Sequence, residues 1–429
     1  MASAPVLMKK RIFPSLLVPM SVAILLASSI TFLHILGNAR FFVLLTFLFI
    51  FIIKKKVLRL FDVQFAFVLF VYLFWCFLTS FWSDIPLLSF MKSGFFIVTV
   101  VTLYCVGADW GKINSREKAL DYLWMFALIT LMTGFLGKII GDPNQTNIHA
   151  TSNLIEYQGF SGGSNMFGSM MGMSFPFLLW KMYSAWLKKA NRVVWTFLGI
   201  SCLYFLILSV SRSAILMVLV TGLLFIFGLK LSKKIILLCI SGFIVLSIIT
   251  VNPSSFFNMI SVTNAYIYKS DKTNLFQSRL SVWQSSYDAA LEGGWFGLGS
   301  GIAFGKTDFN FDHGLTTSSY GREKGNSQLA IIEETGIVGF ILFSVLLLVV
   351  FFRLLKLYIY SNNSEQRILL SIVSGALLGM LAESVFEGWW SAPGAAETMY
   401  FWLLVGVSRS LGTTTNHRRV NYDTPRIEA

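Results

Sequence analysis

Charged side chains are scarce in this sequence, where Asp, Glu, Lys and Arg make up 13% of the 429 residues. Soluble domains carry about 25% of these residues, so the composition excludes an ordinary soluble enzyme. Hydrophobic residues reach 55% and fall into many separate apolar runs. The sequence therefore predicts a membrane protein with many helices, and not a soluble domain with a single anchor.

Cysteine is rare, and its distribution gives no sign of a disulfide framework or a metal site. The four cysteines all lie inside apolar runs: Cys76, Cys105, Cys202 and Cys239. Their spacing matches neither pattern, and we interpret them as packing residues. Acidic residues are also few, which leaves a formal net charge of +13. Membrane proteins collect Lys and Arg in cytoplasmic loops, so we expect no nucleic-acid partner.

Apolar stretches long enough to cross a bilayer, about 17–25 residues, recur along the chain. They lie at 12–33, 39–53, 63–82, 88–108, 119–138, 165–182, 193–210, 213–229, 235–252, 336–355, 367–386 and 395–410. The predicted fold is all-α, a polytopic membrane helix bundle of about 12 transmembrane helices. The second stretch is short, and a re-entrant segment there would reduce the number to eleven.

The positions of Lys and Arg predict the orientation of these helices. With a cytoplasmic N-terminus, 24 of the 34 Lys and Arg residues fall in cytoplasmic segments. The positive-inside rule therefore predicts a multi-pass membrane protein with both termini in the cytoplasm. The apolar run after Lys9-Lys10-Arg11 is too long for a signal peptide and lacks a convincing cleavage site, so we expect a retained helix.

Two predicted extracytoplasmic segments are long, at about 139–164 and 253–335. A loop of the second size in a tightly connected bundle is usually functional. The predicted organisation is helices one to nine at 1–252, the extracytoplasmic loop at 253–335, helices ten to twelve at 336–410 and a polar cytoplasmic tail at 411–429.

The large loop contains a predicted amphipathic helix that ends at Gly293. Apolar residues recur there at helical spacing, at Phe276, Leu280, Trp283, Tyr287 and Leu291. Arg279 lies four residues before Trp283, so the indole can brace the guanidinium group. An interfacial helix whose arginine meets lipid phosphate would explain the same spacing.

A glycine-rich stretch follows this helix. Its end, Gly305-Lys306-Thr307, looks like the end of a phosphate-binding loop. Such a loop needs a glycine five residues before Gly305, where this chain has Ser300 flanked by Gly299 and Gly301. We instead predict a tight turn that packs the helix back onto the membrane surface.

A second arginine is predicted on the same side of the membrane. Arg212 separates two apolar runs with almost no room for a loop, which predicts a position at or just below the extracytoplasmic surface. A boundary arginine that snorkels to the surface is the simpler explanation for Arg212 alone. Arg212 and Arg279 converging on one cavity would suit an anionic diphosphate.

Residues 278–305, SRLSVWQSSYDAALEGGWFGLGSGIAFG, resemble the signature region of the O-antigen ligase and polymerase family, the Wzy-type membrane glycosyltransferases. The shared pattern is an arginine, a tryptophan four residues later and a Gly-x-Gly-x-Gly turn. Further matches follow the order of the family's motifs: Asn165 in GFSGGSNMFG, Arg212 in SVSRSAIL, and Asn326, Glu334, Gly336 and Gly339 in GNSQLAIIEETGIVGF.

The resemblance implies a metal-independent transferase without a cofactor. Its donor would be an undecaprenyl-diphosphate-linked glycan and its acceptor a glycan or glycolipid, with polysaccharide assembly proteins as possible further partners. Arg212 and Arg279 would hold the diphosphate, where positive charge stabilises the departing anion. The remaining matched residues would support the site: Trp283, Asn165, Asn326, Gly299 and Gly301.

The sequence departs from the family where the family has a histidine that is thought to activate the acceptor hydroxyl. Gly325 occupies that position and cannot take a proton. The base could come from His313, Glu323, Asp312 or Glu334, since a base must only lie within hydrogen-bond reach of its proton. His313 can equally be an ordinary exposed loop residue. The acceptor could also need little base assistance, or this member could be inactive.

We predict a polysaccharide polymerase that joins lipid-linked repeat units of an O-antigen, capsule or exopolysaccharide at the outer face of the inner membrane. An O-antigen ligase acting on a lipid A-core or other acceptor is the alternative, and the missing histidine favours the polymerase. A lipid-linked oligosaccharide transporter would carry ionisable residues at helix centres, where this chain has almost none. Glu383 and Glu387 lie near a helix end. A catalytically silent assembly partner is a further alternative.

Overall fold

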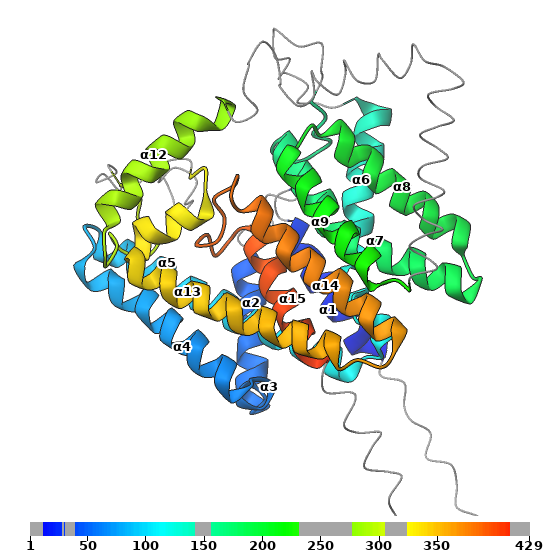
Figure 1. Ribbon diagram of the computed structural model, residues 1–429, viewed down its shortest axis with the longest axis horizontal. Coiled ribbons are helices and arrows are strands. Elements are labelled where there is room, and N and C mark those ends of the chain that lie inside the picture. Colours follow the sequence, from blue (N-terminus) through cyan, green and yellow to red (C-terminus); the bar gives the residue numbers. More distant parts are fainter. Residues whose placement is uncertain are drawn as a thin grey trace, which may run out of the picture.

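The computed structural model describes residues 12–27, 30, 39–141, 156–230, 277–304 and 324–411. These residues are predominantly helical and contain no β-strand, only an isolated bridge between Ile30 and Ser161. The predicted all-α class is therefore confirmed for the part of the chain that is described. Figure 1 shows α14 and α15 lying between a group formed by α4, α5, α12 and α13 and a second group formed by α6 to α9.

All but two of the described α-helices overlap the predicted apolar stretches, the exceptions being Val57–Leu60 and Gln277–Gly293. The first six are α1 (Ile12–Leu26), α2 (Ala39–Ile53), α3 (Val57–Leu60), α4 (Val63–Leu78), α5 (Pro86–Ile113) and α6 (Trp124–Ile140). They are followed by α7 (Ser164–Lys188), α8 (Arg192–Leu208), α9 (Arg212–Gly228), α12 (Gln277–Gly293), α13 (Ser327–Ile359), α14 (Ser364–Glu383) and α15 (Ala396–Ser410). The predicted stretch at 235–252 lies outside the described residues.

Five of the described segments are long and apolar enough to cross a membrane. They are Val63–Trp82, Pro86–Ile113, Arg116–Ile140, Ser327–Ile359 and Ser364–Glu383. Four further apolar helices are shorter, within α1, α2, α8 and α9. Together they support a multi-pass membrane protein, while the number of about twelve spans and the size of the large loop stay predictions.

Large apolar side chains on the outside of the bundle fit a lipid environment. On α4, Phe67, Phe70 and Phe74 are 68%, 64% and 49% exposed. The inner face of the same helix is apolar too, with Leu69 and Tyr72 buried. A helix that is apolar on all sides belongs in a protein core or a membrane, and the outer face of α4 has no protein cover among the described residues.

Glycines allow the central helices to approach closely. A Cβ at Gly107 of α5 would lie 2.2 Å from the carbonyl oxygen of Leu403, and one at Gly406 of α15 would lie 2.2 Å from that of Tyr104. At Gly379 of α14 a Cβ would lie 2.5 Å from the carbonyl oxygen of Met217. Small residues at such contacts are typical of packing between membrane helices.

Polar contacts between helices gather at two ends of the bundle, and α5, α7 and α13 run from one end to the other. The first end pairs predicted cytoplasmic cations with acids: Lys56 with Asp109, Arg409 with Asp62, Lys181 with Asp121 and Lys188 with Glu117. The second end holds the connection from α4 to α5, the glycine-rich turn and the start of α13. This division agrees with the predicted alternation, and which side of the membrane each end faces stays a prediction.

A break in α13 shapes the second end. The helix begins at Ser327, nine residues before the predicted start at 336, because the side chain of Asn326 accepts a hydrogen bond from the Leu329 N–H at 2.9 Å and caps it. Gly336 then has φ 73° and interrupts the helix. The predicted start of the helix at 336 falls at this break, and the first turns of α13 were not predicted from the sequence.

Candidate functional site

The glycine-rich turn after α12 fills the break in α13. The N–H groups of Leu298 and Gly299 donate to the carbonyls of Glu333 and Glu334, at 2.9 and 3.0 Å. In the other direction, the N–H groups of Ile337 and Val338 donate to the carbonyls of Gly294 and Trp295, at 3.0 and 3.2 Å. Backbone groups freed by the break are thereby satisfied, as groups buried away from water must be.

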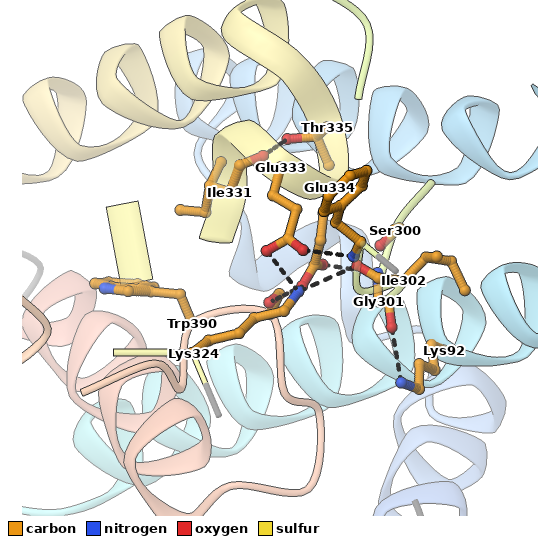
Figure 2. A network of polar contacts seen from close by, with 12 residues as sticks. Lys92, Ser300, Gly301, Ile302, Lys324, Ile331, Glu333, Glu334, Thr335 and Trp390 are labelled. Carbon is orange, nitrogen blue, oxygen red and sulfur yellow. Dashed lines mark hydrogen bonds and ion pairs between the residues drawn. The ribbon is translucent and has the colours of Figure 1, made fainter. Parts of the chain in front are cut away.

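Two buried glutamates of α13 hold the far end of the turn (Figure 2). The Glu334 side chain, in a residue only 2% exposed, accepts the Gly301 N–H at 2.7 Å and the Ser391 hydroxyl at 2.7 Å. Glu333 is fully buried, and its carboxylate accepts the Phe304 N–H at 2.8 Å. Both oxygens of Glu334 are therefore engaged in holding the polypeptide.

Lys324 brings positive charge to both carboxylates. Its ammonium pairs with Glu334 and lies 3.5 Å from Oε2 of Glu333. It also donates to the carbonyl oxygen of Ile302 at 3.2 Å. From α5, Lys92 donates to the carbonyl oxygen of Gly301 at 2.7 Å, as Figure 2 shows. Because a buried carboxylate without a counter-charge is strongly destabilising, the lysines, the glutamates and the turn depend on one another.

The turn also rests on the connection between α4 and α5. The Ser300 N–H donates to the Thr79 hydroxyl at 3.0 Å, and the indole of Trp82 donates to the Gly297 carbonyl at 3.0 Å. Gly299 and Gly301 have φ values of 114° and 76°, which favour glycine. A Cβ at Gly299 would lie 2.4 Å from the Ser83 side chain. The described part of the stretch is a tight turn, as expected, and its position at the membrane surface stays a prediction.

Helix α12 packs against α13 through a different face from the predicted apolar one. Trp283 is partly buried, but Leu280, Tyr287 and Leu291 are 50%, 51% and 62% exposed. A Cβ at Gly293 would lie 2.5 Å from the Ile332 carbonyl oxygen. Small residues on the inner side let α12 come close, and the larger apolar residues are left on the outside. The apolar face predicted from the spacing is therefore the outer face of α12, and its contact with the membrane surface stays a prediction.

Gly325 is enclosed by α12. The indole of Trp283 donates to the Gly325 carbonyl at 3.1 Å, and a Cβ at Gly325 would lie 2.3 Å from Cγ1 of Val282. The Trp283 ring also packs on Phe386, with ring centroids 5.6 Å apart. The position where the family resemblance expects a histidine thus has no space for a side chain unless Val282 moves.

The residues from 383 to 390, which begin at the last residue of α14, connect the other matched positions. Asn326 donates from Nδ2 to the Val385 carbonyl at 3.0 Å, and the Ser327 hydroxyl donates to the Glu387 carbonyl at 2.6 Å. The Asn165 amide lies 3.4 Å from Oε1 of Glu387. Segments separated by 59 to 222 residues in the chain therefore meet here.

Arg212, at the start of α9, lies at the same end. Helices α9 and α14 are antiparallel, because Gly375 approaches Thr221 and Gly379 approaches Met217. Continuing this register places the Arg212 backbone level with the end of α14. On the α7 side, a Cβ at Gly168 would lie 2.5 Å from the Ser211 side chain. Ser169, which follows Gly168 in α7, donates its hydroxyl to the Glu383 carboxylate at the end of α14.

The other predicted site residues are only partly described. Arg279 lies in the first turn of α12, but its side chain, like His313, Glu323 and Asp312, lies outside the described residues. Among the described residues, no three His, Cys, Asp or Glu side chains are grouped to hold a metal ion. Sequence reasoning did not single out Lys324 and Glu333, and it noted Glu383 and Glu387 only by their place near a helix end. Glu333, Glu383 and Glu387 are charged residues within or beside apolar stretches, whereas Lys324 lies in the polar stretch GREKGN.

Comparison with known families identifies the central part of the chain. Residues 196–344 match the family model described as O-antigen ligase. This range covers about a third of the chain and includes Arg212, α12, the glycine-rich turn and the break in α13. The resemblance inferred from the motifs is thereby confirmed. A search of curated proteins found no match.

Proposed function

We propose that this protein is a polysaccharide polymerase that joins lipid-diphosphate-linked glycan units at the outer face of the bacterial inner membrane. The main support is that Asn165, Trp283 and Asn326 contact the residues 383–390. The register of α9 against α14 brings the backbone of Arg212 level with the same residues. Arg212, Trp283 and Asn326 lie inside the range that matches the O-antigen ligase family model, and Asn165 lies before it. A common site explains why such distant motifs share one end of the bundle.

The donor in this proposal is an undecaprenyl-diphosphate-linked glycan. Its leaving group is a diphosphate, and negative charge grows on it as the glycosidic bond breaks. Arg212 binds that charge, and Arg279 in the first turn of α12 supplies a second guanidinium group. Guanidinium forks pair with phosphate oxygens through two parallel hydrogen bonds, so they can take the place of a metal ion in this step.

The acceptor hydroxyl must lose a proton, and the predicted bases are not equally suited to accept it. Glu334 is occupied by the Gly301 N–H, Ser391 and Lys324, which favours a positioning role for it. His313 and Glu323 stay candidates. Phe304 and Lys324, the described residues on either side of their segment, contact the same Glu333 carboxylate.

An O-antigen ligase is the second candidate, and the crowding at Gly325 favours the polymerase. The ligase-type histidine would need space that Val282 fills. The acceptor would then be a growing glycan and not lipid A-core. Association with other polysaccharide assembly proteins is part of the proposal, because repeat units must be delivered across the membrane before they are joined.

Glycan analysis of a deletion strain tests this proposal. Single repeat units capped on the outer acceptor would support a polymerase, and full polymer held on the lipid carrier would support a ligase. Repeat units retained at the cytoplasmic face would indicate a transporter. An unchanged polymer in the deletion strain would rule out all three assignments.

A further inference from the structure

A third arginine lies at the end of the bundle where the motif residues meet. Arg40 is the second residue of α2 and shares a face of that helix with Leu44 and Phe51, which are buried. Phe42 lies on the opposite face and is 73% exposed. An arginine that only anchors a helix among lipid headgroups extends its guanidinium group away from the protein. Arg40 is instead directed into the bundle.

The guanidinium group of Arg40 lies on residues 384–395, which connect α14 to α15. Its Nη1 donates to the Gly394 carbonyl at 2.7 Å, and a Cβ at Gly394 would lie 2.6 Å from Nη2. The first part of the same connection is where Asn165 and Asn326 make their contacts. Arg40 and the motif asparagines therefore meet on one connecting segment.

The positive charge of Arg40 has no counter-charge among the described residues. At the opposite end of the bundle, Arg353 and Arg409 share the carboxylate of Asp62, which is also the first acidic residue of the sequence. Nε of Arg40 is buried without a hydrogen-bond partner, and Nη2, which has no partner among the described residues either, is not enclosed. An arginine inside a membrane bundle marks a functional site, and a guanidinium group suits phosphate oxygens.

Arg40 and Arg212 reach the connection between α14 and α15 from different sides. On the Arg40 side, α2 packs on α5, and Thr99 of α5 donates to the Pro393 carbonyl at 3.2 Å. Arg212 begins α9, which packs on α14. Figure 1 shows α5 and α9 in the groups on the two sides of α14 and α15. The two arginines can therefore bind two separate anions.

We propose that Arg40 binds the diphosphate of the acceptor unit, an inference that rests on the proposed function. A polymerase joins two lipid-linked units, so it holds two diphosphates at once. Arg212 and Arg279 stabilise the diphosphate that leaves the donor. The diphosphate of the acceptor stays attached to its sugar and its lipid, and a separate cation is needed to hold it. Arg40 thus determines how tightly the acceptor binds, and no bond forms or breaks at the group that it holds.

The test separates the lipid diphosphate of the acceptor from its sugar. Full-length protein in phosphatidylcholine nanodiscs receives the lipid-linked repeat unit that accumulates in the deletion strain. The unit is supplied alone, as donor and acceptor, or with an excess of the same oligosaccharide released from its lipid by mild acid. Joining rates over a range of concentrations give KM and kcat for Arg40→Ala, Arg40→Lys and Gly394→Ala. Arg59→Ala is the matched control, because Arg59 is an exposed arginine of α3 at the opposite end.

We expect Arg40→Ala to raise the KM for the lipid-linked unit about 10–100-fold at similar kcat, as the strength of hydrogen bonds between charged groups implies. Joining onto the lipid-free oligosaccharide should be unchanged, and so should both reactions of Arg59→Ala. Arg40→Lys should show part of the effect, because it keeps the charge without the fork. Gly394→Ala should also raise the KM without lowering the unfolding temperature, since its Cβ meets only the end of the Arg40 side chain and Gly394 lacks a positive φ. These two variants provide the comparison if Arg40→Ala does not fold.

Three outcomes overturn the inference and leave the proposed function standing. The first is a wild-type KM of Arg40→Ala for the lipid-linked unit, and the second is an equal loss with both acceptors, which a structural role predicts. The third identifies a phospholipid site: phosphatidylglycerol in the nanodiscs stabilises the wild type and not Arg40→Ala, while joining is unchanged. Wild-type protein that joins units onto neither acceptor would instead contradict the proposed function itself.

Discussion

The ammonium group of Lys324 pairs with the buried carboxylate of Glu334, and that carboxylate holds the backbone N–H of Gly301 at 2.7 Å. Three segments are joined through this one ion pair: the residues before α13, the helix itself and the glycine-rich turn. The pair is well shielded, since the side chains of Lys324 and Glu334 are 14% and 2% exposed. It therefore fixes where the turn stands relative to α13.

Removal of Lys324 should destabilise the protein. Lys324→Met leaves two buried carboxylates beside one another, and breaking a buried pair from one side costs about 3–5 kcal/mol. Lys188→Met is the control, because Lys188 and Glu117 are 50% and 51% exposed and such a surface pair contributes about 0–1 kcal/mol. Thermal unfolding of the purified proteins in detergent should show a clear loss only for Lys324→Met. Equal unfolding temperatures would contradict the proposed role of the pair.

Gly336→Ala should displace the glycine-rich turn. The residue has φ 73°, and a Cβ would lie 2.1 Å from the Trp295 carbonyl oxygen. Backbone strain alone costs about 1–3 kcal/mol, and the clash adds to it. Gly222→Ala within α9 has no atom within 4 Å of the new Cβ and should leave stability unchanged or slightly higher. Limited proteolysis between residues 293 and 324 would report the displacement, and wild-type cleavage of Gly336→Ala would argue against it.

Arg212→Ala should abolish high-molecular-weight glycan while the protein still inserts into the membrane. Arg212→Lys should restore only part of the polymer, because an ammonium group keeps the charge and loses the two-pronged contact with phosphate. Arg192→Ala, at the start of α8 and the opposite end of the bundle, is the matched control. Glycan gels of complemented deletion strains measure the effect. A normal polymer length distribution with Arg212→Ala would remove this residue from the site.

Introducing the family's histidine should not increase activity. In Gly325→His the new Cβ would lie 2.3 Å from Cγ1 of Val282, so Val282 and the packing of α12 around it must shift. We expect polymer below the wild-type level and a lower unfolding temperature. Val282→Ala removes the nearest contact and should recover part of the stability in the double variant. Higher activity in the single variant would mean that Gly325 is a lost base and not a packing residue.

The sequence predicted the elements better than it predicted their contacts. Apolar length located the helices, and motif order identified Arg212 and the region around Trp283. It could not show that the residues 383–390 join these motifs, because Asn165 and Glu387 are 222 residues apart and meet only through packing of α7, α9 and α14. It also offered Glu334 as a base, since a motif does not reveal that Gly301 and Lys324 occupy the carboxylate.

The side of α12 that packs on α13 could not be predicted from the sequence either. Periodicity grouped Leu280, Tyr287 and Leu291 with Trp283, but close packing at Gly293 turned the small residues inward. Hydrophobic spacing identifies a helix reliably. It identifies the face that packs on protein only where the other faces of the helix meet water. At a membrane surface, lipid can cover an apolar face as well as protein can.

The most direct test is to incubate the purified full-length protein with isolated lipid-linked repeat units and to measure product masses by mass spectrometry. A polymerase predicts a ladder of lipid-linked products spaced by one repeat unit, with one lipid diphosphate released for each new bond. The ladder should be absent with Arg212→Ala and present with Arg192→Ala. Wild-type protein that leaves the repeat units unjoined, in the presence of intact donor binding, would contradict the proposed polymerase.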